Sequence, residues 1–446
     1  MDAQAALDHA FALAREHRLK DVDALLAREE SMTIWVLNGR VEKVDQSTGL
    51  GLGLRVVEQG RTGIAFTERL EPEAIERAFL AAKENSGLLD PTEVVLNTEF
   101  PEVPEPGALG LYNPQLEELT FEELAAFALD AEAAAKGADK RVTSVPYSAV
   151  GRSTSTSRVV STHGMDYSQR SNSVSAYCSA LLEHNGARKS GSRSWAALSW
   201  DGQRGGALGR EAVEEGAALL GAEKIAGGAI PVVLDEYCAP RLLGMFFGSF
   251  SAEAAQKEQS RLKGRLGERI AGADIDLTDE PHRPGGPGSR YLDAEGTPTR
   301  PMPLIEAGRF ANFLYHLESA RKEGRQSTGH AGRGYTGGIS TRSHNLVMPT
   351  GAHTLDGLTA VPERCLLVTQ LEGGAGCNPL SGDISIGVQG FLMEGGKRVH
   401  PVDGVTIAGN FFDLLNNISE RGDFYQPNLS KLFIPPLLVE GLVVAS

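Results

Sequence analysis

Apolar residues recur at helical spacing in four segments of the first half of the chain. The positions are Leu7, Ala10, Phe11 and Ala14; Ile75, Ala78, Phe79 and Ala82; Leu124, Phe127, Ala128 and Ala131; and Val213, Gly216, Ala217 and Leu220. Spacings of three and four residues place such side chains on one face of a helix. Thr120 and Glu123 add a capping box, in which a hydroxyl and a carboxylate bind the backbone N–H groups that begin the third helix. The pattern therefore predicts four amphipathic helices.

Between these helices the apolar residues alternate with the two-residue period of β-strands. We expect strands at residues 33–37, 41–44, 50–56 and 63–66, which would form a four-stranded meander, and a strand-rich stretch at residues 141–200. The Asn-Gly pairs at 38–39 and 185–186 tolerate the positive φ angles of hairpin turns. Glycines 49, 51 and 53 lie inside a strand pattern, so they indicate close backbone packing and not a phosphate-binding loop.

The pattern changes near residue 226, and strands dominate after residue 303. Residues 230–234 read as a short buried strand, and Pro240 is expected to open a long helix whose first half is apolar on nearly all sides. Residues 281–303 form a proline-rich loop, and later strands are expected at 366–370, 384–388, 391–393, 405–408 and 437–444. The prediction is an α+β protein, with an N-terminal α/β domain at 1–225 and a mainly antiparallel β domain at 226–446.

Composition and charge limit the partners and the compartment. The 446 residues include 52 glycines and carry 43 basic against 58 acidic side chains, a net charge of −15. This charge disfavours direct binding to nucleic acid or to anionic membranes, since both present negative surfaces. Four widely separated cysteines are typical of a reducing compartment. The first residues lack the apolar core of a signal peptide, and no apolar run approaches about 18 residues. We expect a cytoplasmic protein.

Catalytic motifs are scarce. The sequence contains no G-x-S-x-G elbow, no P-loop and no H-E-x-x-H pair. Ser260 and Lys263 match S-x-x-K, but their charged neighbours fit an exposed helix face. The residues of one C-terminal span that could converge on a zinc ion are His330, His344, His353, Cys365 and Cys377. Zinc sites usually show closely spaced ligand pairs, which these residues lack, so polar or core roles are the more common interpretation.

Several separated blocks, in the same order, resemble the TldD/PmbA family of bacterial and archaeal proteins. Residues 49–63 (GLGLGLRVVEQGRTG) are similar to a glycine-rich strand and turn of that family. Residues 292–298 (LDAEGTP) resemble its D-x-E-G-T-P segment, and the block from 378–383 (NPLSGD) through 401–409 (PVDGVTIAG) resembles its C-terminal signature. The resemblance covers essentially the whole chain and implies an N-terminal α/β domain followed by a β-rich, barrel-like C-terminal domain.

The family has two branches that assemble together. The TldD branch carries H-E-x-x-x-H on a helix, with a cysteine near the C-terminus as third zinc ligand. In this chain Gly244, Met245 and Ser249 occupy the corresponding motif positions, and no cysteine follows Cys377. Glycine offers no side-chain ligand and methionine no general base. The resemblance therefore places the chain in the PmbA branch, also called TldE, with no catalytic residue and no metal of its own.

That branch implies a heterodimer with a TldD-like subunit, which holds the zinc and hydrolyses peptides. The implied reactions are removal of leader segments from modified peptides, as in microcin maturation, and degradation of flexible polypeptides. His330, Arg333 and Tyr335 are candidates for contacts in a peptide cleft, where a substrate could add a strand to a sheet edge. Two alternatives stay open: a self-sufficient metallopeptidase with a Cys/His site, and a regulatory protein of the kind described as a modulator of DNA gyrase. A homodimer of the isolated chain also stays open.

Overall fold

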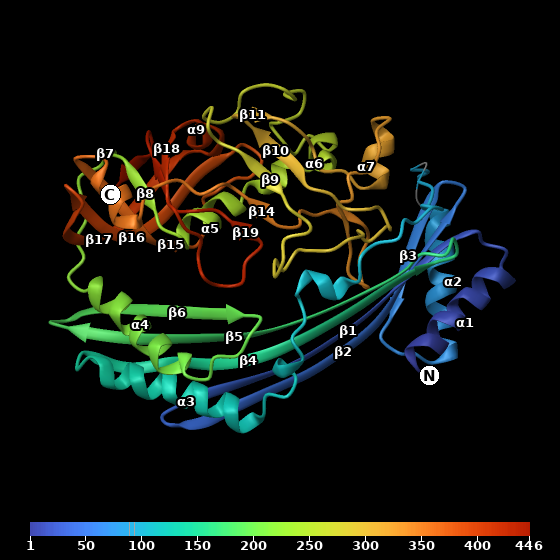
Figure 1. Ribbon diagram of the computed structural model, residues 1–446, viewed down its shortest axis with the longest axis horizontal. Helices are drawn as coiled ribbons and strands as arrows, with labels where there is room; N and C mark the ends of the chain where they lie inside the picture. Colours follow the sequence, from blue (N-terminus) through green and yellow to red (C-terminus); the bar gives the residue numbers. More distant parts are fainter. Residues whose placement is uncertain (89, 93) are drawn as a thin grey trace.

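A six-stranded antiparallel sheet dominates the first half of the computed structural model, which describes residues 1–88, 90–92 and 94–446 (Figure 1). Its strands follow the order β3-β2-β1-β4-β5-β6, and we call it the N-terminal sheet. The strands are β1 (Asp21–Leu37), β2 (Arg40–Glu58), β3 (Arg61–Thr67), β4 (Val142–Ser161), β5 (Asp166–His184) and β6 (Ala187–Ala197). Most are far longer than an average strand of about five or six residues, so the sheet forms a long, curved platform.

Two pairs of helices cover opposite ends of one face of this sheet (Figure 1). The helices are α1 (Ala3–Glu16), α2 (Pro72–Leu88), α3 (Phe121–Ala138) and α4 (Arg204–Ala218). Leu26 of β1 packs with α1 and α2, whereas Ile34 of the same strand packs with α3 and α4. The four predicted helices and the capping box of Thr120 and Glu123 are confirmed. We call this helix-covered face the outer face and the opposite one the inner face.

The predicted four-stranded meander is wrong, because residues 41–44 and 50–56 belong to one strand, β2. The polar segment between them stays paired with β1 from Thr33–Asp45 to Glu29–Gly49. This segment crosses the part of the sheet between the two helix pairs, where no helix packs on it. Its side chains can therefore be polar, and the strand continues through its pairing with β1 although the apolar alternation stops. The hairpin turn at Asn38 is confirmed, with positive φ of 55° there and 75° at the following glycine.

The remaining strands form three further sheets, mostly antiparallel, in what we call the C-terminal part. The eight-stranded sheet contains, in order, β18 (Ile418–Arg421), β20 (Leu437–Val439), β8 (Val232–Leu234), β15 (Arg364–Glu372), β16 (Asp383–Glu394), β17 (Lys397–Asn410), β21 (Val443–Ala445) and β7 (Gly228–Ala229). The five-stranded sheet contains β11 (Arg309–Phe310), β10 (Met302–Glu306), β9 (Leu277–Asp279), β14 (Leu346–Val347) and β19 (Leu432–Phe433); β12 (Ala331–Gly332) pairs with β13 (Ser340–Thr341). The predicted fold class, α+β with a β-rich second half, is confirmed.

The remaining helical segments are short. They are α5 (Cys238–Gly244), α6 (Ala252–Gln256), α7 (Leu317–Lys322), α8 (Leu355–Ala360) and α9 (Phe411–Asn416), with 3-10 turns η1 (Pro106–Leu109), η2 (Pro114–Leu116) and η3 (Phe247–Phe250). No helix among the described residues is long and apolar enough to cross a membrane. The predicted strands at 384–388 and 391–393 are one strand, β16, with a register shift between Val388 and Gly390.

The long helix expected after Pro240 is wrong, although its predicted burial is confirmed. The α-helix α5 ends at Gly244 and the 3-10 turn η3 follows. Glycine is a poor helix former, and Ser251 adopts extended backbone and caps α6 through its side chain. The break lets Phe246 stack on Phe411 at 4.8 Å while Phe250 packs against a different ring.

The C-terminal part lies over the inner face of the N-terminal sheet (Figure 1). Leu25, Val159 and Tyr167, on neighbouring strands, pack against Leu292 in a small apolar cluster. The N-terminal sheet uses residues 21–197 and the C-terminal sheets use residues 228–445, so the predicted boundary near 225 lies in the segment between them.

Candidate functional site

A cavity of about 430 Å³ lies between the inner face of the N-terminal sheet and loops of the C-terminal part. Its floor comes from β1, β4 and β5, and its roof from residues 287–294 and 333–335. The polar or charged side chains among its lining residues include Arg28, Glu29, Ser155, Ser157, Tyr167, Gln169, Ser171, Arg290, Asp293, Arg333 and Tyr335. We call it the inner cavity. Two of the three predicted cleft residues, Arg333 and Tyr335, line it.

Tyr335 is pressed against the glycine-rich run of β2. A Cβ at Gly51 would lie 2.2 Å from the tyrosine ring, and a Cβ at Gly53 would lie 2.3 Å from the tyrosine carbonyl oxygen. The phenolic hydroxyl donates to Glu68 Oε1 at 2.7 Å. These contacts confirm that the glycines allow close packing, and they fix one wall of the inner cavity.

Arg333 belongs to a buried network of four charges. Its Nη2 lies 2.6 Å from Asp23 Oδ1, and Arg55 bridges Asp23 and Glu295, with Nη1 2.6 Å from Glu295 Oε1. All four side chains are at most 3% exposed. Burial opposes ionisation of Asp23, but the charges of Arg333 and Arg55 hold its pKa below the ordinary value. The network ties the N-terminal sheet to the C-terminal part.

The D-x-E-G-T-P block, residues 293–298, supports the contact between the N-terminal sheet and the C-terminal part. Asp293 accepts backbone N–H bonds from Glu295, Thr297 and Ala331, each at 2.9 Å. Burial, together with nearby Glu295, raises the pKa of Asp293 to about 7. Asp293 thus organises the turn that presents Glu295 to the charge network.

The third predicted cleft residue, His330, has no exposed surface, so it lies beneath the surface that a bound peptide would touch. Its Nε2 is 3.1 Å from Asp279 Oδ2, and His344 Nδ1 is 3.5 Å from the same oxygen. Of the five residues in the alternative zinc site, the structure therefore brings together two, with an aspartate that the sequence did not single out. His353 instead lies 3.3 Å from Glu420.

The positions that the family resemblance matches to the zinc motif lie at the end of α5 and in η3. Gly244 is half-buried, and a Cβ there would lie 2.7 Å from a methyl group of Leu432, which would have to move aside for a larger side chain. Met245 faces Gly374, whose Cβ would lie 3.1 Å from the methionine methyl. Ser249 is buried, and its carbonyl oxygen accepts a hydrogen bond from Ser260 at 2.6 Å. Within the described residues, the one group with metal-binding geometry does not include this segment.

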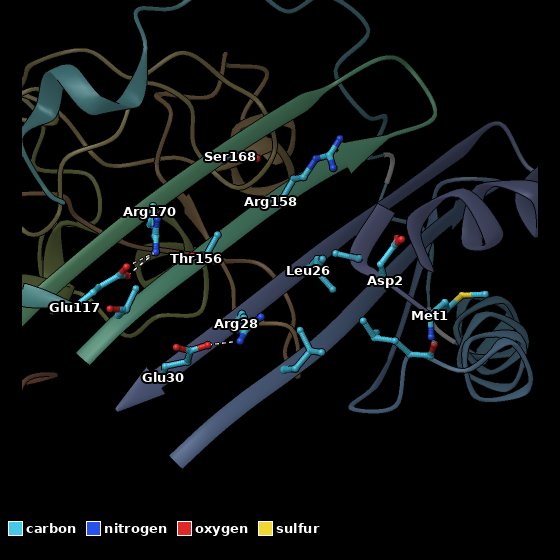
Figure 2. Close-up of a pocket in the computed structure, with 14 residues that line it drawn as sticks. Met1, Asp2, Leu26, Arg28, Glu30, Glu117, Thr156, Arg158, Ser168 and Arg170 are labelled. Atoms are coloured by element: carbon cyan, nitrogen blue, oxygen red, sulfur yellow. Dashed lines mark hydrogen bonds and ion pairs between the residues drawn. The ribbon is translucent and has the colours of Figure 1, made fainter. Parts of the chain in front are cut away.

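A larger cavity, of about 690 Å³, lies on the outer face between the two helix pairs. In Figure 2, Arg170 is joined to Glu117 and Arg28 to Glu30; Arg158, also drawn there, pairs with Asp166 outside the cavity lining. Arg170 also stacks 4.1 Å over the ring of Tyr112. Because these arginines are already neutralised, the outer cavity offers no evident catalytic group.

The chain is similar to known proteins over most of its length. It matches three consecutive domains of one family: PmbA/TldA metallopeptidase domain 1 at residues 22–86, the central domain at 114–220 and the C-terminal domain at 227–446. It is 28% identical over 408 residues to the metalloprotease PmbA of Escherichia coli O157:H7, covering 90% of this chain and 87% of that protein.

Solved structures of related proteins have the same fold. A Thermotoga maritima protein, described as a proposed modulator of a DNA gyrase, shares 29% identity with a TM-score of 0.88 and covers both chains completely. TldE of Thermococcus kodakarensis shares the fold, with 24% identity, a TM-score of 0.84, and 99% and 100% coverage. The chain therefore belongs to the PmbA/TldD family of metallopeptidases and, within it, to the PmbA branch.

Proposed function

We propose that this chain is a non-catalytic, TldE-like subunit of a zinc metallopeptidase, whose TldD-like partner holds the zinc and cleaves the peptide. The observation that carries the proposal is the segment at the end of α5, where Gly244, Met245 and Ser249 offer neither a metal ligand nor a general base. Without them, no zinc-bound water can be activated at this helix. The catalytic zinc is accordingly assigned to the partner.

The inner cavity supports a role in holding the substrate. Ser155, Ser157 and Ser171 project into it from the floor, and Tyr335 closes one side. Small hydroxyl side chains can bind a peptide backbone without selecting its sequence, which suits flexible polypeptides and leader segments of modified peptides. These are the substrates we propose.

The net charge and the cysteines limit the partners and the compartment that we propose. The net charge of −15 opposes direct contact with DNA, so the regulatory alternative, action on a gyrase, would require protein contacts. None of the four cysteines, all within the described residues, forms a disulfide. Free cysteines are typical of a reducing compartment, so we propose that the heterodimer acts in the cytoplasm. A self-association of the isolated chain is the competing assembly.

The proposal is tested by co-expressing the chain with a TldD-like subunit from the same organism. We expect a 1:1 complex by light scattering and zinc-dependent cleavage of an unstructured peptide. Ser155→Trp fills the inner cavity and should reduce cleavage, mainly through a higher KM. Thr156→Trp, on the next residue, points into the outer cavity and should leave cleavage unchanged. Failure to associate, or equal effects of the two substitutions, would count against the proposal.

A further inference from the structure

Three side chains from three segments converge in the interior of the C-terminal part. Asp279 ends β9, His330 directly precedes β12, and His344 lies two residues before β14. Asp279 and His330 have no exposed surface, and His344 is 4% exposed. One ligand atom from each lies within 4.8 Å of the others. The sequence distances between them hide this cluster from motif searches.

One ring nitrogen of this cluster lacks a partner. His344 Nδ1 is buried and makes no hydrogen bond with any residue that the structure describes. It lies 3.5 Å from Asp279 Oδ2, and the two histidine rings are 4.7 Å apart. The distance between His344 Nδ1 and Asp279 Oδ2 is long for a hydrogen bond but suitable for two ligands of one metal ion.

The surroundings orient the other two groups as metal ligands are usually oriented. His330 Nδ1 lies 2.8 Å from Thr328 Oγ1, whose hydroxyl can donate to the Tyr315 carbonyl. In the absence of a metal ion, a protonated His330 Nε2 donates to Asp279 Oδ2, 3.1 Å away; with its proton on Nδ1 instead, His330 has the Nε2 lone pair free for a metal ion. Asp279 also accepts two backbone N–H groups, that of His344 on Oδ2 at 2.8 Å and that of Asn345 on Oδ1 at 3.0 Å. Such outer hydrogen bonds fix the ring tautomer and the carboxylate at metal sites.

We propose that Asp279, His330 and His344 bind one divalent first-row metal ion, and that zinc is a suitable probe. Ligands about 2.0–2.1 Å from a tetrahedral zinc lie about 3.4 Å from one another; the two carboxylate–histidine separations are 3.1 and 3.5 Å. Two imidazoles and one carboxylate suit such ions, with water as a further ligand. This metal is structural, because its ligands are buried and tie β9 to the segments before β12 and β14.

The proposal revises the expectation that this chain holds no metal, and it does not depend on the proposed function. Nearby positive charge opposes the ion. Arg290 interacts electrostatically with His344, and Lys431 with Asp279. Arg290 makes no ion pair among the described residues, and its buried Nε has no partner. Removing its charge should therefore tighten metal binding.

The test is metal content of the purified full chain, produced without a histidine tag, stripped with chelator and dialysed against zinc chloride. We expect one zinc per chain in the wild type and a higher melting temperature after loading. Asp279→Asn and His344→Gln should each lose the zinc and the temperature shift. Cobalt substitution should give visible absorption bands in the wild type only.

Two controls separate this site from the other zinc alternative. His353→Ala and Cys377→Ala should retain full zinc content, and Arg290→Gln should bind zinc more tightly than the wild type. Arg290→Gln keeps the proposal testable if the ligand variants do not fold. The proposal is overturned if the wild type binds no zinc, if Asp279→Asn keeps it, or if Cys377→Ala loses it.

Discussion

Replacing Gly53 by alanine tests whether the Tyr335 loop really lies against β2. The new Cβ would sit 2.3 Å from the carbonyl oxygen and 2.8 Å from the Cα of Tyr335. Both are backbone atoms, so the loop must move. Overpacking of this kind costs about 1–3 kcal/mol, which exceeds the gain of about 0.5–1 kcal/mol from replacing glycine in a strand. Gly53→Ala should therefore lower stability by about 1–2 kcal/mol.

The same strand provides matched controls. An added Cβ at Gly49 would meet nothing within 4 Å, so Gly49→Ala should be neutral or slightly stabilising. The nearest atoms to an added Cβ at Gly51 all belong to the Tyr335 ring. The cost of Gly51→Ala should consequently fall in a Tyr335→Ala background, whereas the cost of Gly53→Ala, which arises from backbone, should persist.

Urea unfolding followed by tryptophan fluorescence measures these effects. Trp35 and Trp195 lie in strands of the N-terminal sheet, and Trp200 packs on Phe127 beside them. The fluorescence change therefore reports the sheet that carries β2. Equal unfolding midpoints for Gly49→Ala and Gly53→Ala would refute the docking of the loop on this strand.

Three further predictions follow from burial and charge. Arg55→Met leaves the buried Glu295 without its ion-pair partner and Asp23 with Arg333 alone, and should cost about 3–5 kcal/mol in urea unfolding, whereas Arg188→Met, in an exposed pair, should cost below about 1 kcal/mol. Burial raises the pKa of Asp235 to about 7, so the folded chain keeps a proton that the unfolded chain loses near pH 4. Stability should fall from about pH 4 to about pH 7, by on the order of 4 kcal/mol; Asp235→Asn should flatten this dependence, and an unchanged slope would contradict it. Introducing both histidines with Gly244→His and Ser249→His should lower the melting temperature without adding bound zinc, because Ser249 is buried and the two positions lie in separate elements, α5 and η3; a second stoichiometric zinc would contradict that arrangement.

Local chemistry made much of the fold predictable. The hairpin at Asn38, the capping box at Thr120 and the helical stripe of α1 each depend on a few neighbouring residues. The continuity of β2 did not follow from its sequence, since its polar middle is held by pairing with β1 and not by burial. The break after Gly244 depends on where Phe246 and Phe250 find partners in the core.

The candidate site was less accessible to sequence reasoning. Arg333 and Tyr335 were singled out from a glycine-rich loop, but their roles depend on Asp23 and on the glycines of β2, roughly 280–310 residues earlier in the chain. Asp279 gave no signal of its own, because only folding brings it to the two histidines. Long-range packing of this kind leaves no local pattern.

The most direct test of the proposed subunit role asks which chain performs the chemistry. Peptide cleavage should be measured for this chain alone and for two complexes of it. One complex contains the unaltered TldD-like subunit, and the other contains that subunit with its zinc-motif histidines replaced by alanine. We predict no cleavage by this chain alone and none by the pair that contains the altered partner, even though that pair still assembles. Zinc-dependent cleavage by this chain alone, or by the pair with the altered partner, would contradict the account.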